Sequence, residues 1–262
     1  MKRESDLRIF VVALSLALVC SVVVSVTAVM LQPIQAKNAT INRNRNVLIA
    51  CGEYNPKVSI KEAFKNIRTG FVKLGTAEFV ESDDLSDFYR NFQQISTSPK
   101  TSVNVPDDLP SIGYPTVPKH MPAYILQDEN GQISKVVIMV YGKGLWSTLY
   151  GFLSVKSDGR TVQGLTFYQH GETPGLGGKV DNKEWKQQWN GKKLYGKSGN
   201  VRISVIKGNV DATAENAKYK VDGLSGATMT TNGVDNLIKF WVSDFAYGTF
   251  LKSLSKSGEV SE

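Results

Sequence analysis

The stretch "AYILQDENGQISKVVIMVYG", residues 123–142, decides the fold class. Two runs rich in β-branched and aromatic residues flank Asn130–Gly131, a dipeptide typical of the tight turn between antiparallel strands. The stretch "YGFLSVKSDGRTVQGLTFYQH", residues 150–170, repeats this design around Asp158–Gly159. Four strands in two hairpins are therefore expected over residues 123–169, and they predict an antiparallel sheet.

Helical signals surround the hairpins. Ser59 and Glu62 fit a capping box, and they predict a short helix over "IKEAFKNI". The segment "NKEWKQQW", residues 182–189, is typical of another short helix. A final helix is predicted because one apolar face forms at i, i+3, i+4, i+7 and i+11: Val234, Leu237, Ile238, Trp241 and Phe245. The fold class is therefore α+β, an antiparallel sheet built from hairpins with packed helices.

Two further segments connect these elements. "VRISVIKG", residues 201–208, is predicted as a strand. Residues 82–118 are interpreted as a loop-rich connection because they include Pro106, Pro110, Pro115 and Pro118.

The N-terminus predicts a single transmembrane helix. Residues 9–31 carry no charge, and 23 residues are about the length that an α-helix needs to cross a bilayer core. A cleaved signal peptide is disfavoured, because its apolar region is usually about 7–15 residues long. Basic residues in the stub 1–8 place the remainder outside the cytoplasm. Residues 32–50 are expected as a stalk or first helix, residues 32–122 as the stalk and first part of the outer domain, and residues 251–262 as a C-terminal tail.

Composition excludes several classes of protein. The chain has 262 residues and a net charge of +7, but its basic residues form no dense run, so nucleic-acid binding is not favoured. Cys20 lies in the predicted span and Cys51 outside it, so they are not expected to pair. Cys51 is interpreted as a small core residue, because a polar segment separates it from the apolar run that a lipidation site requires. The two histidines stand far apart, and no Cys/His spacing indicates a metal site.

The stretch "DGLSGATMTTNG", residues 222–233, is unusual in having four hydroxyls and three glycines just before a predicted helix. A helix N-terminus offers unpaired N–H groups and partial positive charge, and glycines allow close approach of a ligand. The stretch therefore suits a phosphate or another anion. Helix capping by Thr231 or Asn232 explains the same residues, and the local pattern leaves both readings open.

Two more glycine-rich loops flank the predicted sheet: "HGETPGLGGKV", residues 170–180, and "YGKGLWSTL", residues 141–149. Trp146 in the second loop could be a core residue or the wall of a ligand site. Three such loops suggest a flat, phosphorylated ligand, such as a nucleotide or flavin. The chain has no Walker A motif, no dinucleotide fingerprint and no G-x-S-x-G hydrolase elbow.

The motifs "SGAT", residues 225–228, and "GETPGLGG", residues 171–178, resemble the signatures of the FMN-binding domain family. This domain is shared by the C subunit of the sodium-translocating NADH:quinone reductase and the G subunit of the Rnf complex. The resemblance covers most of residues 123–250, which are therefore expected to form the FMN-binding domain, and also the N-terminal anchor. The chain length and the "NGV…FW" ending favour the reductase family over its Rnf counterpart.

The resemblance implies that FMN is joined through its phosphate to the hydroxyl of Thr228. A separate flavin transferase, which uses FAD and magnesium, makes this bond and reads a motif that includes Asp222 and Ser225. The expected cofactor-binding residues lie in four short segments: Ser225, Gly226, Ala227 and Thr228; Glu172, Thr173 and Leu176; Gly144, Leu145 and Trp146; and Lys207. Leu176 would face the flavin ring, Leu145 and Trp146 would form a second wall, and Lys207 would place a cation near the phosphate or pyrimidine side.

The function implied by the resemblance is electron relay from NADH toward ubiquinone within a sodium-pumping membrane complex. The chain would be one subunit of that enzyme, without an NADH site of its own. Its expected partners are the other subunits, the flavin transferase and the membrane, with the soluble domain on the periplasmic side of a bacterial inner membrane. The alternatives are an Rnf-type electron-transport subunit and a membrane-anchored module that binds a phosphorylated ligand without redox chemistry.

Overall fold

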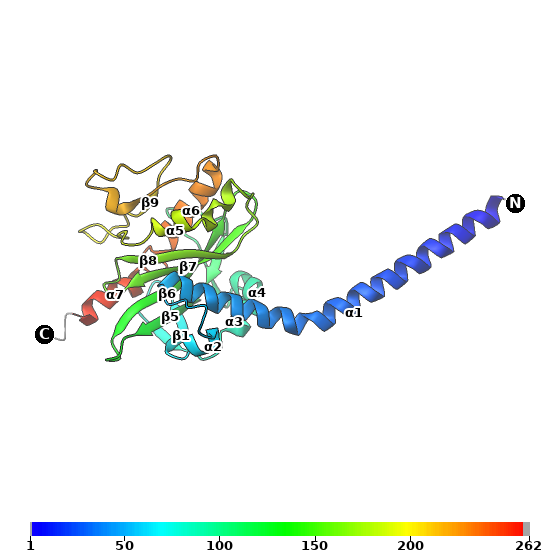
Figure 1. The fold of residues 1–262 in the computed structure, drawn as a ribbon, viewed down its shortest axis with the longest axis horizontal. Coiled ribbons are helices and arrows are strands. Elements are labelled where there is room, and N and C mark those ends of the chain that lie inside the picture. Colours follow the sequence, from blue (N-terminus) through cyan, green and yellow to red (C-terminus); the bar gives the residue numbers. More distant parts are fainter. Residues whose placement is uncertain (1, 259–262) are drawn as a thin grey trace. The chain divides into compact units, whose positions relative to one another are not determined.

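The computed structural model describes residues 2–258, and the chain divides into two compact units, residues 1–42 and 43–262 (Figure 1). Helix α1 (Lys2–Cys51) runs through the first unit and ends in the second. The side chains of residues 6–39 are exposed. Within the described residues, α1 is the helix whose length and composition suit a membrane span. The predicted span and the segment after it therefore form one continuous helix.

The second unit contains a six-stranded sheet in which each neighbouring pair of strands is antiparallel. In spatial order the strands are β2 (Phe79–Glu81), β1 (Ile67–Lys73), β5 (His120–Gln127), β6 (Ile133–Lys143), β7 (Thr148–Lys156) and β8 (Val162–Gln169). The two predicted hairpins are confirmed as β5–β6 and β7–β8. Gly131 and Gly159 have φ values of 77° and 62°, a conformation that glycine adopts without strain.

The sheet also recruits residues that precede the first hairpin. Strand β1 pairs with β5 from Ile67–Leu126 to Lys73–His120, so residues before 123 belong to the same sheet and the same compact unit as the first hairpin. The predicted loop-rich connection instead contains α3 (Ser86–Arg90), α4 (Phe92–Thr97) and a ribbon of β3 (Ser102–Asn104) and β4 (Thr116–Pro118). Phe88 of α3 packs against Phe71 of β1, and Phe92 of α4 packs against Tyr141 of β6, so tertiary contacts hold both short helices to the sheet.

Helices cover both faces of the sheet. Residues 136–142 of β6 are all buried, which requires cover on both sides. The end of α1 lies on one face, where the Thr166 hydroxyl contacts Asn46 Oδ1 at 3.1 Å. Helix α6 (Thr228–Trp241) lies on the other, because a Cβ at Gly142 would approach Leu237 to 2.8 Å. Figure 1 shows α5 and β9 near α6, beside β8.

The C-terminal segment differs from the expected long helix and tail. Helix α6 ends at Trp241, so Phe245 lies outside it, and α7 (Gly248–Gly258) follows. Leu251 and Leu254 are buried, which gives this segment an apolar face to pack. Residues 259–262 of the expected tail lie outside the described residues.

Smaller elements complete the unit. Ser59 caps α2 (Ile60–Ala63) and Asn182 caps α5 (Lys183–Gln187), which confirms both predicted short helices. The remaining elements are η1 (Gly177–Asp181), β9 (Ser204–Val205), η2 (Ala217–Tyr219) and β10 (Lys220–Val221). The strand predicted over residues 201–208 is thus only two residues long, and the Val205 N–H donates to Asp235 Oδ1 on α6.

Candidate functional site

Three loops meet at one end of the sheet. Tyr150 pairs with Gln169, so the start of β7 lies beside the end of β8. This register places the β6–β7 loop, residues 144–147, next to the loop at residues 170–176. The first turns of α6 lie against the β6–β7 loop, because a Cβ at Gly233 would be 2.3 Å from the carbonyl oxygen of Lys143. The structure therefore brings together the three glycine-rich segments of the sequence.

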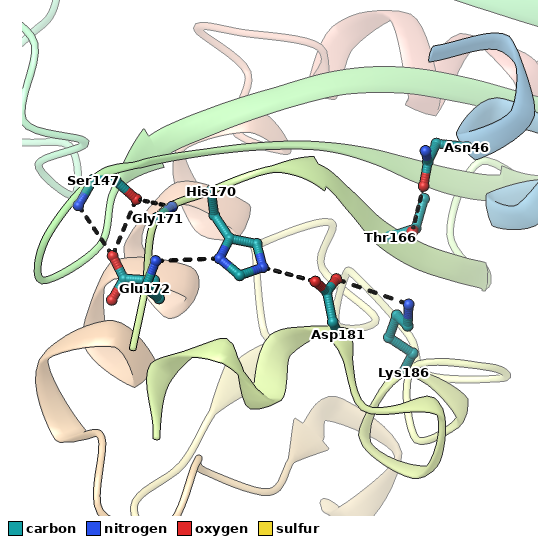
Figure 2. A network of polar contacts seen from close by, with 8 residues as sticks. All are labelled: Asn46, Ser147, Thr166, His170, Gly171, Glu172, Asp181 and Lys186. Carbon is teal, nitrogen blue, oxygen red and sulfur yellow. Dashed lines mark hydrogen bonds and ion pairs between the residues drawn. The ribbon is translucent and has the colours of Figure 1, made fainter. Parts of the chain in front are cut away.

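The carboxylate of Glu172 joins these segments, and Figure 2 shows its contacts with Ser147 of the β6–β7 loop. Its Oε1 accepts hydrogen bonds from the N–H of Trp146 (3.0 Å), the N–H of Ser147 (3.1 Å) and the Ser147 hydroxyl (3.3 Å). Its Oε2 accepts from the N–H of Leu145 (3.2 Å) and the Thr230 hydroxyl (2.6 Å). Glu172 is only 5% exposed, so its carboxylate is largely shielded from solvent by these loops.

These hydrogen bonds favour the charged form of Glu172. Burial raises the pKa of a carboxyl group, but the Thr230 hydroxyl and the amides of residues 145–147 outweigh burial and hold the pKa of Glu172 below its ordinary value. The group therefore stabilises the folded state above its ordinary pKa. This contribution is lost as the pH falls through the lower pKa of the folded protein.

Replacing Glu172 with Gln is expected to flatten this acid dependence. The variant should lose about 1–3 kcal/mol of unfolding free energy at neutral pH, because buried donors lose an acceptor. Between about pH 6 and about pH 3, the unfolding free energy of the variant should fall by less than that of the wild type. Urea unfolding across this range measures both effects. Glu129→Gln is the control, because the Glu129 side chain is exposed in the turn between β5 and β6. Equal losses of stability in acid for the wild type and Glu172→Gln would contradict the prediction.

The four hydroxyls of residues 222–233 have different environments. Thr230 and Thr231 are buried; Thr230 donates to Glu172, and Thr231 accepts from the N–H of Leu224 and donates to the carbonyl of Ala227. Ser225 and Thr228 are exposed. Thr228 is therefore an exposed hydroxyl at the first position of α6.

The start of α6 differs from both expected caps. The helix begins at Thr228, three residues before Thr231, and its N-cap is Ala227. No side chain among the described residues makes a capping hydrogen bond there. Thr231 is already within the first turn, where its hydroxyl bonds back to the loop. The helix N-terminus keeps N–H groups and partial positive charge that an anion can use.

Exposed apolar side chains surround this helix start. Trp146 is 71% exposed, so it is not a core residue, and Leu145 and Leu176 are 48% and 45% exposed. Sequence reasoning missed Met229, which is 61% exposed beside Thr228; its place in the motif was the available signal. It also missed Lys179, whose Nζ donates to the Ser225 carbonyl at 3.1 Å.

The remaining predicted site residues lie in the same region. The carbonyl of Thr173 accepts from the N–H groups of Leu176 and Gly178 and shapes their turn. Gly226 has a φ of 78°, and Leu176 packs over it, with its Cδ2 3.1 Å from the position of a Cβ. Ala227 is buried, and Lys207 is exposed on a loop whose Gly208 carbonyl accepts from the N–H of Gly223.

Asp222 has a structural role. Its Oδ1 accepts from the N–H of Val210 and its Oδ2 from the side-chain amide of Gln188, at 2.7 and 2.9 Å. Its carbonyl accepts from Trp185 Nε1. Asp222 therefore holds the hydroxyl-rich loop against Trp185, Gln188 and Val210.

His170 extends the polar network away from Glu172 (Figure 2). Its Nδ1 accepts from the N–H of Glu172 at 3.2 Å, so Nε2 carries the proton and donates to Asp181 at 2.8 Å. Lys186 on α5 lies 3.9 Å from Asp181. His170 thereby holds the loop after β8 to both Glu172 and Asp181. The position of His170 in the sequence did not indicate this role.

Gly177 leaves space for the Glu172–Thr230 hydrogen bond. A Cβ there would lie 2.5 Å from Thr230 Oγ1 and 2.8 Å from Glu172 Oε2. Gly177→Ala is therefore expected to separate this pair and to cost about 1–3 kcal/mol of unfolding free energy. Gly171→Ala is the matched control, because its nearest atom would lie at an ordinary 3.4 Å. Thermal unfolding compares the two variants, and equal stability would refute the packing argument.

Comparisons with known proteins agree with this geometry. Residues 144–243 match the FMN-binding domain family. The chain is 40% identical to the C subunit of the Na(+)-translocating NADH-quinone reductase of Pseudomonas aeruginosa, over 97% of this chain and 98% of the relative. It is 37% identical to the same subunit of Yersinia pestis, over 93% and 91%.

Solved structures show the same relation. The crystal structure of NqrC from Shewanella oneidensis superposes with a TM-score of 0.72 and 31% identity, covering 81% of this chain and 96% of that one. The corresponding reductase subunit from Parabacteroides distasonis gives a TM-score of 0.60 and 27% identity, covering 84% and 96%. This chain therefore belongs to the NqrC family, the C subunits of the Na(+)-translocating NADH-quinone reductases.

Proposed function

We propose that this chain is an electron-transfer subunit that carries FMN, joined through its phosphate to Thr228. It works in a membrane complex that oxidises NADH, reduces ubiquinone and pumps sodium ions. The environment of Thr228 carries the proposal: its hydroxyl is exposed at the first position of α6, while those of Thr230 and Thr231 are buried and hydrogen-bonded. The names of the relatives support the complex.

The residues present fit a flavin phosphate. The N-terminus of α6 has N–H groups without a side-chain cap among the described residues, and its dipole favours an anion. Lys179 contacts the Ser225 carbonyl, and Lys207 is exposed on the loop beside Gly223. These cations would neutralise the phosphate and reinforce the helix terminus.

The same surface fits the flavin ring. Leu145, Trp146 and Leu176 are exposed apolar side chains on the two loops that flank the helix start. An aromatic ring against them removes apolar area from water, which is favourable by roughly 25 cal/mol per Å². Trp146 and Leu176 would therefore orient the ring, while Thr228 holds the phosphate.

Attachment requires a separate enzyme, because a threonine hydroxyl is a weak nucleophile by itself. With FAD as donor, the Thr228 oxygen bonds to the flavin-side phosphorus and the pyrophosphate P–O bond breaks. AMP leaves and the hydroxyl proton is released. Bound FMN supplies one-electron chemistry, and the protein binds and orients it.

Orientation and partners follow from the same proposal. Basic residues before the apolar run favour a cytoplasmic N-terminus, which places residues 43–262 on the periplasmic side of the inner membrane. NADH would bind another subunit, since this chain lacks a dinucleotide fingerprint. The other subunits of the reductase and the flavin transferase are the proposed protein partners.

Intact mass tests the proposal. The full chain is expressed with and without a flavin transferase, and peptides are mapped. A gain equal to FMN minus water, on the peptide that contains Thr228, is expected only with the transferase. If an active transferase produces no gain, the covalent flavoprotein is excluded and a non-redox ligand-binding module becomes the better description.

A further inference from the structure

Glu172 has an unusual electrostatic environment. Among the side chains whose burial is described, it is the one buried carboxylate. No ion pair of Glu172 with Lys, Arg or His occurs in the described part of the chain. Its charge is balanced by hydrogen-bond donors alone: three backbone amides and two hydroxyls.

The position of this charge is also informative. The carboxylate bonds directly to the amides of Leu145 and Trp146, whose side chains point outward and are largely exposed. It therefore lies immediately behind the proposed second wall of the flavin site. Through Thr230 it also bonds to α6, two residues after Thr228.

Space at Glu172 is reserved by two glycines. A Cβ at Gly144 would lie 2.6 Å from Glu172 Oε1, and one at Gly177 would lie 2.8 Å from Oε2. Both loops thus approach the carboxylate more closely than any other residue type would permit. A smaller apolar side chain would fill the same space without the energetic cost of burying a charge.

We propose that Glu172 is a positioning residue for the flavin, which fixes the Leu145–Ser147 wall to α6 and sets a negative charge behind that wall. The inference rests on the proposed function. Reduction adds negative charge to the flavin, and a nearby anion in a poorly screened interior opposes it. Glu172 therefore lowers the midpoint potential of the flavin and makes the reduced cofactor a stronger electron donor.

A purely structural role makes a different prediction. A clasp without an electrostatic role would change stability and leave the midpoint potential of the flavin unaltered. Two readouts separate these cases: a redox titration of the bound flavin and its fluorescence anisotropy, which reports how tightly the ring is held.

The experiment uses the full chain, co-expressed with a flavin transferase. Glu172→Gln removes the charge, and Thr230→Val removes one hydrogen bond but keeps the charge. Glu81→Gln removes an exposed carboxylate from β2, at the other edge of the sheet from β8. Glu172→Gln is expected to raise the midpoint potential and lower the anisotropy. Thr230→Val should lower the anisotropy with a smaller change in potential, and Glu81→Gln should change neither.

A folded Glu172→Gln protein with the wild-type potential or the wild-type anisotropy overturns the inference. So does an equal shift in potential for Glu81→Gln. If Glu172→Gln does not fold, Thr230→Val decides, and unchanged anisotropy there overturns the inference. Failure of the proposed function is distinguishable, because the wild-type chain would then carry no covalent flavin in the presence of an active transferase.

Discussion

Replacing Thr228 with Ala is expected to abolish covalent flavin and leave the protein folded. The Thr228 side chain is exposed, and the buried residues Val234, Leu237 and Trp241 anchor α6 farther along. The unfolding free energy should therefore change by no more than about 0.5 kcal/mol. The loss of flavin should be complete, because the variant has no oxygen at the site of attachment. Intact mass and flavin fluorescence of the denatured protein measure it.

Three variants control this experiment. Thr228→Ser keeps a hydroxyl at the same position and should retain flavin. Ser225→Ala removes the other exposed hydroxyl of the stretch, within the motif that the transferase would read, and should slow the attachment without abolishing it. Thr230→Val removes a buried hydroxyl and should also retain flavin. A flavin mass on Thr228→Ala would contradict the assignment of Thr228. So would a result in which Thr230→Val is the one variant that loses flavin.

Replacement by Ala is expected to destabilise the protein strongly at one tryptophan and hardly at all at another. Trp241 is fully buried, its Nε1 donates to the Tyr141 carbonyl at 2.7 Å, and its ring contacts those of Tyr141 and Tyr247. Trp241→Ala should therefore cost about 3–5 kcal/mol of unfolding free energy. Trp146 is 71% exposed, and Trp146→Ala should change stability by no more than about 0.5 kcal/mol.

The cofactor readout should reverse this order. Trp146→Ala should change the visible spectrum and anisotropy of the attached flavin, because the variant removes one wall of the site. Urea unfolding followed by circular dichroism gives the stability of both variants in parallel. Similar losses of stability for both would show that Trp146 is packed, and an unchanged flavin signal in Trp146→Ala would remove it from the proposed site.

Local sequence was sufficient for the elements that local physics controls. Gly131 and Gly159 can adopt the left-handed conformation that their turns need, and the runs beside them have the residue types of strands, so both hairpins could be predicted. Ser59 and Asn182 supply helix caps within three residues of the amides that they bind. The uncharged run at residues 9–31 indicated the membrane helix by length alone.

Elements that depend on distant partners could not be predicted in the same way. Strand β1 depends on pairing with β2 on one side and β5 on the other. Helices α3 and α4 are too short to show a helical period. At the start of α6, Thr230 bonds to the distant Glu172, and the Thr231 hydroxyl bonds back to the carbonyl of Ala227 within the first turn. From residue types alone, Thr231 and Asn232 were equally suitable caps.

The sequence by itself therefore determined the two hairpins, the long apolar N-terminal helix and the hydroxyl-rich motif that contains Thr228, because each depends on residues close together in the chain. Only the tertiary structure decided that Trp146 is exposed and that Glu172 is buried. It also decided that the Thr230 hydroxyl is buried in a hydrogen bond while Thr228 is exposed. The Glu172–Thr230 hydrogen bond joins residues 58 positions apart. Burial and hydrogen-bond partnership at that separation follow from the folded packing of three loops, which no local pattern encodes.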